Sequence, residues 1–250
     1  MNPPPTIRLI QGQSLAEMDR LIEAGACFDL IFADPPYFLS NGGITCQNGK
    51  MVKVDKGDWD RSEGADINHQ FNWEWLRRCR DLLSPNGTLM VSGTFHVIYS
   101  VGFAMQQLEM KLLNNITWEK PNPPPNLACR TLTHSTETII WAARDDKAKY
   151  GFNYAEMKAE NGDKQMKDVW RFTAPRAEEK THGKHPTQKP IALMERLIRL
   201  ASKEGDAVLD PFMGSGTTGV ACQRLARHFT GIEMNPDYIT LAQNRLGIEA

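Results

Sequence analysis

The sequence predicts an α/β fold, with a mostly parallel sheet and helices on both faces. Two apolar runs, 28–33 and 207–209, are each followed by an aspartate and are typical of buried strands. Between them, short apolar strands alternate with helical stretches, the order that builds a sheet flanked by helices. With 250 residues and 41% hydrophobic content, the chain can bury one core, so a single domain is expected over residues 1–250.

The first of these runs leads directly into Asp34-Pro35-Pro36-Tyr37. Asp34 would emerge at the carboxyl end of its strand, where open α/β sheets place their ligands. The prolines have no N–H groups and fix φ, which leaves carbonyl oxygens free to point outward. A carboxylate beside a carbonyl suits an exocyclic amino group, and Tyr37 offers a ring on which an unstacked base could lie. The alternative is a polar turn in which the two prolines end a strand.

The middle of the chain supplies the rest of the sheet and its helices. Strands are expected over 88–91, 115–118 and 138–142, and helices over 71–83, 97–108 and 190–202. The helix over 190–202 has a proline at its start and repeats apolar residues on one face. That stripe indicates packing on the core rather than a cofactor site.

A glycine-rich turn lies late in the chain, between the run 207–209 and a helix expected over 217–227. Gly214, Gly216 and Gly219 allow a tight backbone that presents N–H groups at the start of the helix. This strand, turn and helix suit a ligand of nucleotide type.

An acidic residue follows the next predicted strand. The strand covers 228–232 and is followed by Glu233, which lies at the right distance from Gly214 to reach a ribose diol. A connection without a ligand, a dinucleotide site and a single-nucleoside site all remain open. A dinucleotide needs a second mononucleotide half, and only a helix over 236–246 follows, so a single nucleoside fits better.

Several separated motifs together resemble a known family. They are Asp34-Pro35-Pro36-Tyr37, His185-Pro186-Thr187-Gln188-Lys189-Pro190 and Asp210-Pro211-Phe212-Met213-Gly214-Ser215-Gly216-Thr217-Thr218. In this order they resemble the β-class amino-methyltransferases of DNA, in which the catalytic region precedes the S-adenosylmethionine region. Segments 38–43, 56–60, 113–118 and 134–139 resemble the DpnA-type adenine methyltransferases of restriction–modification systems. The similarity covers nearly the whole chain, from about Leu9 to Leu246.

The resemblance implies a Rossmann-like S-adenosylmethionine-dependent methyltransferase fold, circularly permuted, with a small target-recognition insertion. It places Asp34 and the Pro35 carbonyl on the adenine amino group, completes the catalytic motif with Pro36, and stacks Tyr37 on the flipped base. The cofactor residues that it implies are Gln13, Ala33, His185, Thr187, Lys189, Asp210, Phe212, Gly214, Ser215, Gly216, Thr217, Glu233 and Asn235. The implied DNA contacts are Ser40, Asn41, Lys50, Lys53, Lys120 and Arg130. Near Gln13 the family usually carries an aspartate, so this contact to the cofactor's adenine would lack charge.

The implied reaction is methyl transfer from S-adenosylmethionine to adenine N6 within GATC, leaving S-adenosylhomocysteine. The base must rotate out of the stack, at a cost of a few kcal/mol, and duplex and single-stranded DNA are both open as substrates. A homodimer and a cognate restriction endonuclease are expected from the resemblance. The alternatives are a cytosine-N4 methyltransferase, a catalytically silent DNA-binding module and, last, a dehydrogenase.

Composition is consistent with an intracellular enzyme but does not identify it. The net charge is only −1, so phosphate contacts must come from local basic clusters, such as those at 77–80, 50–56 and 180–189. Each of these could equally be a solvated face. The five cysteines have no metal-ligand spacing and indicate reduced thiols without a metal site. Neither a signal peptide nor a membrane span is visible, so a cytoplasmic protein is expected.

Three segments are given regional roles. Residues 38–63, rich in glycine, asparagine and lysine, are expected to form a mobile loop that closes over DNA, with a plain surface loop as the alternative. Residues 144–182, together with 121–130, are the candidate for target recognition, although their aromatic residues could simply anchor a subdomain. Residues 185–250 form the expected S-adenosylmethionine-binding region.

Overall fold

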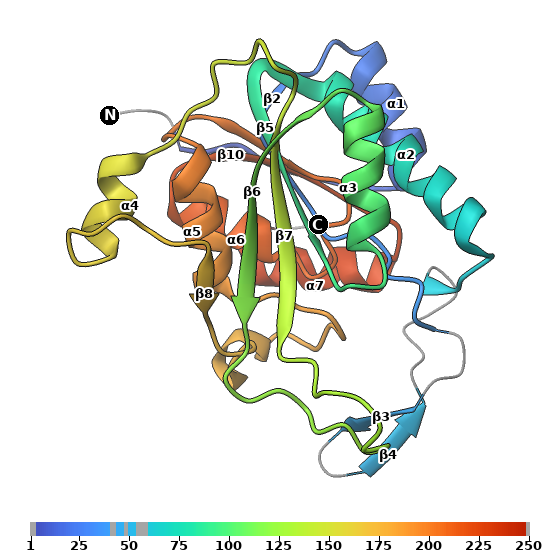
Figure 1. Ribbon diagram of the computed structural model, residues 1–250. Helices are drawn as coiled ribbons and strands as arrows, with labels where there is room; N and C mark the ends of the chain where they lie inside the picture. The colour runs from blue at the N-terminus through green and yellow to red at the C-terminus, as the bar shows by residue number, and fades with distance from the viewer. Residues whose placement is uncertain (1–3, 41–43, 48–49, 54–59, 249–250) are drawn as a thin grey trace.

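The structure, a computed structural model, describes residues 4–40, 44–47, 50–53 and 60–248 and has the predicted α/β architecture (Figure 1). In chain order its elements are β1 (Ile7–Gln11), α1 (Ser14–Glu23), β2 (Phe28–Ala33), β3 (Ile44–Gln47), β4 (Lys50–Lys53), α2 (Ala65–Leu82), β5 (Leu83–Gly93), α3 (Ile98–Gln107), β6 (Lys111–Glu119), β7 (Thr136–Ala143), α4 (Tyr154–Glu160), β8 (Val169–Arg171), the 3-10 helix η2 (Ala177–Lys180), α5 (Ile191–Ala201), β9 (Ala207–Asp210), α6 (Thr217–Arg224), β10 (His228–Glu233) and α7 (Pro236–Leu246).

An eight-stranded sheet in the order β1-β10-β9-β2-β5-β7-β6-β8 forms the middle layer. Neighbouring strands are parallel from β1 through β5. Strand β7 is antiparallel to both of its neighbours, and the short edge strand β8 is parallel to β6. The sheet is therefore mostly parallel, as predicted, with one reversed strand.

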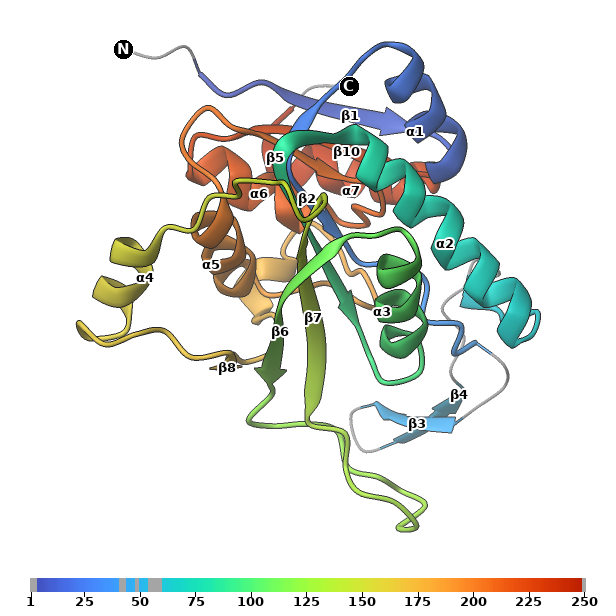
Figure 2. The same ribbon diagram turned by 45° about the horizontal axis from the view of Figure 1, so that its top comes forward.

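Helices cover both faces of this sheet (Figures 1 and 2). The buried residues of α1, α2 and α3 form one core, and most of those of α4, α5, α6 and α7 form the other, with a small separate cluster of Ile191, Val220 and Leu246. Strand β2 serves both cores, because Ile31 and Ala33 pack on the first while Leu30 and Phe32 pack on the second. Strand residues alternate between faces, so the nearly continuous apolar run at 28–33, interrupted only by Asp29, results from burial on both sides.

Several elements differ from their predicted bounds. Helix α2 begins at Ala65, and β5 begins directly after it at Leu83, although Ser84-Pro85-Asn86-Gly87 is typical of a turn. Helix α6 ends at Arg224, and the next turn puts Ala226 at a positive φ of 57°. Within the expected 38–63 loop, β3 and β4 pair as a short antiparallel sheet.

Two connections extend from the same edge of the main sheet. One carries β3 and β4, and the other runs from the end of β6 to the start of β7 over residues 120–135; both lie at the bottom of Figures 1 and 2. The carboxyl end of β5 lies at this edge as well, because Gly93 pairs with Thr138 near the start of β7.

Candidate active site

Four neighbouring parallel strands end at one edge of the sheet and bring the predicted motifs together. Asp34 follows β2, while Asp210 and Glu233 are the last residues of β9 and β10. The pairing of Ile31 with Leu209 and of Gly231 with Asp210 puts the ends of these three strands at nearly the same level of the sheet. The early and late motifs, about 175 residues apart in sequence, therefore share one site.

The glycine turn after β9 is held in a left-handed conformation. Gly214 has φ of +50°, and its N–H donates to Glu233 Oε2 at 3.0 Å. A Cβ on Gly214 would lie 3.0 Å from the His185 ring, and one on Gly216, at φ +74°, would lie 2.9 Å from Ala242 Cβ. Glycine is required at both positions for backbone conformation and for space.

Arg245 supports the turn from α7. Its Nη1 donates to the carbonyl oxygen of Ser215 at 2.7 Å, to the Ser215 hydroxyl at 2.8 Å and to the Thr217 hydroxyl at 3.0 Å. Burial lowers the pKa of Arg245. One partly buried cation thus fixes three atoms of the turn.

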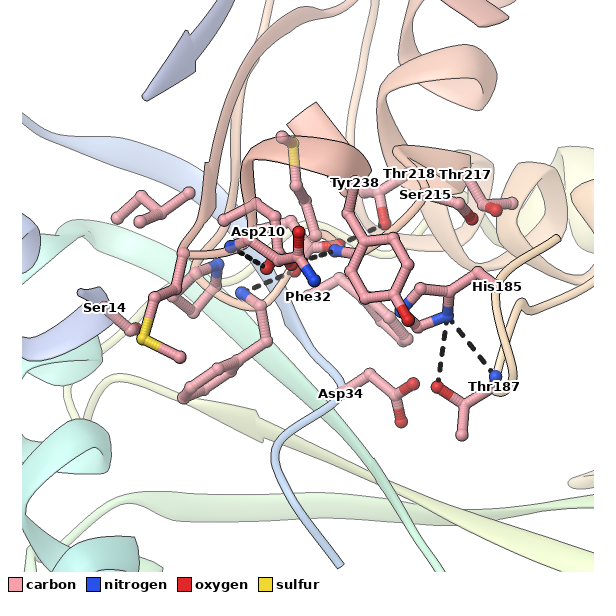
Figure 3. A pocket seen from close by; sticks show the side chains of 18 of the residues that line it. Ser14, Phe32, Asp34, His185, Thr187, Asp210, Ser215, Thr217, Thr218 and Tyr238 are labelled. Carbon is pink, nitrogen blue, oxygen red and sulfur yellow. Dashed lines mark hydrogen bonds between the residues drawn. The ribbon is translucent and has the colours of Figure 1, made fainter. Parts of the chain in front are cut away.

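A pocket of about 320 Å³ lies over this edge (Figure 3). The Asp34 carboxylate points into it, and His185 lies between Thr187 and Tyr238. The predicted residues that line the pocket are Gln13, Asp34, Pro36, His185, Thr187, Lys189, Asp210, Phe212, Gly214, Ser215, Thr217, Glu233 and Asn235. The other predicted catalytic and cofactor residues, Ala33, Pro35, Tyr37 and Gly216, are buried next to this lining rather than in it. The sequence motifs thus identify most of the lining.

Tyr37 lies in a buried polar network at Asp34, and this network includes Lys189. The Tyr37 hydroxyl donates to Asp34 Oδ1 at 2.6 Å, lies 3.2 Å from Ser92 Oγ and reaches Glu137 Oε2 at 3.5 Å. Lys189 Nζ donates to Asp34 Oδ2 at 2.5 Å. Lys189 was expected near the cofactor; it lines the pocket, and its ammonium also contacts the Asp34 carboxylate.

Charge balance governs the pKa values in this network. Burial alone would raise the pKa of Glu137, but Lys189 and Lys120 outweigh it and lower the pKa to about 2. Burial alone would lower the pKa of Lys189, but Asp34 and Glu137 keep it above its ordinary value. Burial and the neighbouring carboxylates raise the pKa of Tyr37 well above 10.0. At neutral pH these pKa shifts keep Glu137 as a carboxylate, Lys189 as an ammonium and Tyr37 as a neutral phenol.

Asp60 fixes the backbone at the end of the predicted catalytic motif and just after it. Its carboxylate accepts from the N–H of Tyr37 at 2.9 Å, the N–H of Leu39 at 3.2 Å and the hydroxyl of Ser40 at 2.9 Å. Ser40 was expected to contact DNA; it is instead buried and bonded to Asp60, because its hydroxyl completes this cluster.

Gln13 caps a helix at the rim of the pocket. Its side-chain oxygen accepts from the N–H of Ala16 at 2.9 Å and so begins α1. The next residue, Ser14, also lines the pocket, and its Oγ is buried with no hydrogen-bond partner among the described residues. Gln188 Oε1 is in the same situation. Two acceptors in the wall are thus available to a ligand.

The two carboxylates on the floor of the pocket have raised pKa values. Burial raises the pKa of Asp210 to about 7, although bonds from the Thr218 hydroxyl and the Phe212 N–H oppose it. Burial also raises the pKa of Glu233, against bonds from the N–H groups of Asn235 and Gly214. Each carboxylate oxygen keeps a further lone pair, so Glu233 can still accept from a ligand.

The remaining predicted DNA contacts have different outcomes. Lys120 forms an ion pair with Glu137 and lies 4.6 Å from the Trp118 ring centroid, so it belongs to the buried network rather than to a free phosphate-binding surface. Arg130 is exposed in the 120–135 connection. Asn41 and the side chains of Lys50 and Lys53 lie outside the described residues. The cluster at 77–80 contributes Arg78, which joins α2 to α1 through Asp19.

Sequence reasoning missed several residues of the site. Glu137 is an acid inside an apolar strand, and that isolated charge was the available signal. Tyr238 lies in the first turn of α7, where its ring centroid is 4.3 Å from that of His185. The apolar lining residues Phe32, Phe71, Met194, Met213, Ile232 and Met234 carry no signal of their own, because apolar residues at such positions usually belong to the core.

The 144–182 segment is anchored to the fold by its aromatic residues. Trp170 in β8 is buried, and Tyr150 and Phe172 pack against the same core. Its far end reaches the pocket side of the molecule, where Glu179 accepts hydrogen bonds from Gln188 and from the N–H of Ile191. The anchoring interpretation therefore holds for these three rings.

Neither a metal site nor a membrane helix is found within the described ranges. No group of three or more His, Cys, Asp or Glu residues there could hold a metal ion. No described helix is both long and apolar enough to span a bilayer. The described cysteines, Cys27, Cys79, Cys129 and Cys222, are free thiols.

This arrangement, with a glycine turn and an acidic strand end on one side of a pocket and Asp34 on the other, defines a Rossmann-like methyltransferase. The chain matches the DNA methylase family over residues 28–244 and belongs to that family. It is 55% identical to the type II methyltransferase M2.DpnII of Streptococcus pneumoniae over 222 residues, which is 88% of this chain and 83% of the relative. It is 50% identical to the type II methyltransferase M2.MboI of Moraxella bovis over 217 residues, 87% of this chain and 80% of the relative.

A solved structure agrees with these relatives. The crystal structure of an M1.HpyAVI–SAM complex is similar with a TM-score of 0.75 and 30% identity, covering 97% of this chain and 100% of that chain. The predicted α/β methyltransferase fold and the predicted membership of the DpnA-type class are confirmed. The circular permutation stays a prediction.

Proposed function

We propose that this DNA methylase transfers a methyl group from S-adenosylmethionine to the N6 amino group of adenine in DNA. The observation that carries the proposal is the Asp34 carboxylate, which points into the pocket while Tyr37 and Lys189 hold its two oxygens. An amino group entering the pocket would meet an acceptor that is already oriented.

The pocket suits S-adenosylmethionine. Its volume of about 320 Å³ lies in the range of small-molecule sites, and the oxygens of Ser14 and Gln188 lack partners among the described residues. We assign Glu233 to the ribose hydroxyls, Gln13 to the adenine end, and His185 and Thr187 to the methionine end. We assign Lys189 to holding the Asp34 carboxylate in place.

The chemistry requires alignment more than activation. The sulfonium supplies an activated methyl group, so positioning of the attacking nitrogen is the main task of the protein. Asp34 and the Pro35 carbonyl would accept the two amino hydrogens, favour a tetrahedral nitrogen and stabilise its developing charge. The N–C bond forms as the C–S bond breaks, and the nitrogen then releases one proton, which leaves neutral methyladenine and a neutral thioether. Asp34 acts through its charge rather than as a base before attack.

The resemblance to the DpnA type supports adenine as the target base and GATC as the recognition sequence. Relatives that act on cytosine commonly have serine at the position of Asp34, so Asp34 favours adenine. Cytosine-N4 methylation is the second candidate, because cytosine also offers an exocyclic amino group.

DNA is proposed to approach the edge that carries β3, β4 and the 120–135 connection, where Arg130 is exposed. Residues 38–63 would close over it, residues 144–182 would contribute to target recognition through their pocket-side end, and residues 185–250 would form the cofactor-binding region. A homodimer, a cognate endonuclease and a cytoplasmic location are further proposals, supported by the resemblance to restriction–modification enzymes.

Transfer of a labelled methyl group to DNA with and without GATC, followed by nucleoside digestion, tests the reaction, the base and the site together. We expect N6-methyladenine confined to GATC-containing DNA. N4-methylcytosine would select the second candidate. Cofactor binding without transfer to any DNA would select a silent binding module.

A further inference from the structure

Three exposed rings gather outside the pocket. The Phe95 ring, with 46% of the residue exposed, has its centroid 3.8 Å from that of His96 and 4.7 Å from that of His134. The Phe95 and His134 planes are stacked, at 26° to each other. The Thr94 hydroxyl lies 3.3 Å from His96 Nδ1 and orients that imidazole.

Both chain segments that carry these rings begin at the catalytic network. Phe95 follows Ser92 by three residues, and His134 precedes Glu137 by three. Ser92 and Glu137 both contact the Tyr37 hydroxyl. Three residues span at most about 11 Å of extended chain, so Phe95 and His134 are attached within about that distance of Ser92 and Glu137.

The charge of these two segments favours a polyanion. Residues 92–108 and 120–136 contain no Asp or Glu, while Arg130, which is exposed, lies in the second segment. A phosphate backbone can approach without local repulsion, and flat exposed rings offer stacking surfaces to bases of any sequence.

We propose that Phe95, His96 and His134 form a stacking platform for an unpaired base of the substrate strand, beside the base that enters the pocket. The platform rests on the proposed function, since it assigns part of the DNA contact of the same enzyme. It holds the strand by base stacking, separately from the carboxylate chemistry at Asp34.

The matched control lies on the neighbouring helix. Tyr99 in α3 is 76% exposed and also aromatic, but it carries no ring contact to the platform among the described residues. Phe95→Ala and Tyr99→Ala each remove one exposed ring. A general effect of losing a ring would change DNA affinity equally in both variants, whereas the platform predicts a loss only for Phe95→Ala. Phe95→Trp keeps a ring at the site.

Affinity for a single-stranded GATC oligonucleotide, measured by fluorescence anisotropy at fixed salt, tests the platform. We expect Phe95→Ala to weaken binding about tenfold, within the range known for base–aromatic stacking. Tyr99→Ala should stay within about twofold, Phe95→Trp should restore binding, and cofactor affinity should be unchanged in all three. Methyl transfer should show the loss in KM rather than in kcat.

An abasic scan identifies the stacked base. Removing that base should weaken binding to the wild type but not to Phe95→Ala. This difference is the coupling energy of a double-mutant cycle between the base and Phe95. Equal effects of Phe95→Ala and Tyr99→Ala, absence of coupling at every position, or a change in oligomeric state with unchanged DNA affinity would overturn the platform. Absence of DNA binding by the wild type would overturn it too.

The two proposals fail separately. Wild-type methyl transfer with normal binding by Phe95→Ala would leave the proposed function standing and remove the platform. DNA binding that depends on Phe95, without any methyl transfer by the wild type, would leave the platform standing and remove the proposed function.

Discussion

Lys189 Nζ lies 2.5 Å from Asp34 Oδ2, an oxygen of the carboxylate that we propose receives the target amino group. The ammonium also has Glu137 Oε2 at 3.5 Å and the Tyr37 hydroxyl at 3.3 Å. These neighbours can keep Lys189 paired when an amino group engages Asp34. The buried network holds two carboxylates, of Asp34 and Glu137, against two ammoniums, of Lys189 and Lys120, so removing one member leaves an unbalanced charge.

Asp34→Ala is expected to lower kcat by at least about 100-fold, because it removes the acceptor aimed at the reacting nitrogen. Cofactor affinity should stay largely intact, since the glycine turn and Glu233 are untouched. Single-turnover methyl transfer and calorimetric cofactor binding measure the two effects. Asp81→Ala, at an exposed acid paired with Arg77, is the control, and near-normal turnover of Asp34→Ala would refute the role.

Glu137→Gln is expected to lower the free energy of unfolding by about 3 kcal/mol at pH 7, because it leaves buried ammoniums undercompensated. Glu119→Gln, on the neighbouring strand and 3.8 Å from exposed Arg171, should cost less than about 1 kcal/mol. Urea unfolding measures both values.

The effect of Glu137 should depend on pH in a defined direction. Its pKa of about 2 is below the unfolded value, so its contribution is complete above about pH 4.3 and is lost as the pH falls toward 2. The difference between wild type and Glu137→Gln should therefore shrink as the pH falls from about 4.3 toward 2. A constant difference over this window would contradict the ion pairing.

Gly216→Ala is expected to destabilise the protein more than Gly205→Ala. Both glycines have positive φ, at 74° and 84°, so both substitutions carry backbone strain of roughly 1–2 kcal/mol. At Gly216 the new methyl would also lie 2.9 Å from Ala242, whereas nothing lies within 4 Å at Gly205. Overpacking adds about 1–3 kcal/mol, and thermal unfolding of the two variants should show that difference. Equal destabilisation would argue against close packing between the turn and α7.

Cofactor affinity is expected to rise with pH near neutrality. Burial raises the pKa of Asp210 to about 7, so in the free protein its contribution to stability is complete below the unfolded value and is lost as the pH rises through about 7. A cationic ligand in the same pocket favours the ionised carboxylate. Affinity for S-adenosylmethionine should therefore rise by up to about tenfold between pH 6 and 8.

Calorimetry with S-adenosylhomocysteine provides the comparison for Asp210. The product shares the amino acid and nucleoside parts but lacks the sulfonium charge. Its affinity should change less over the same pH interval. Identical slopes for the two ligands would show that Asp210 does not sense the sulfonium.

Strand ends could be predicted from the sequence, whereas long-range side-chain pairing could not. The predicted bounds of β2 and α7 agree with the structure, because an apolar run and a proline-started helix are local signals. Asp34, Gly214 and Glu233 were found because each follows or ends a strand at one edge. The contacts of Lys189 with Asp34 and of Lys120 with Glu137 join distant parts of the chain, and no periodicity connects such positions.

The place of β9 in the sheet has a consequence for the growing chain. This strand lies between β10 and β2 and so joins the two halves of the sheet, yet it is among the last to be made. On the ribosome, β2 and the catalytic motif emerge long before the strand that must pack beside them. A nascent or truncated chain ending before Ala207 has Asp34 but neither the glycine turn nor Glu233. Modification of the cell's DNA by this enzyme therefore begins only after β9 and β10 have emerged and folded.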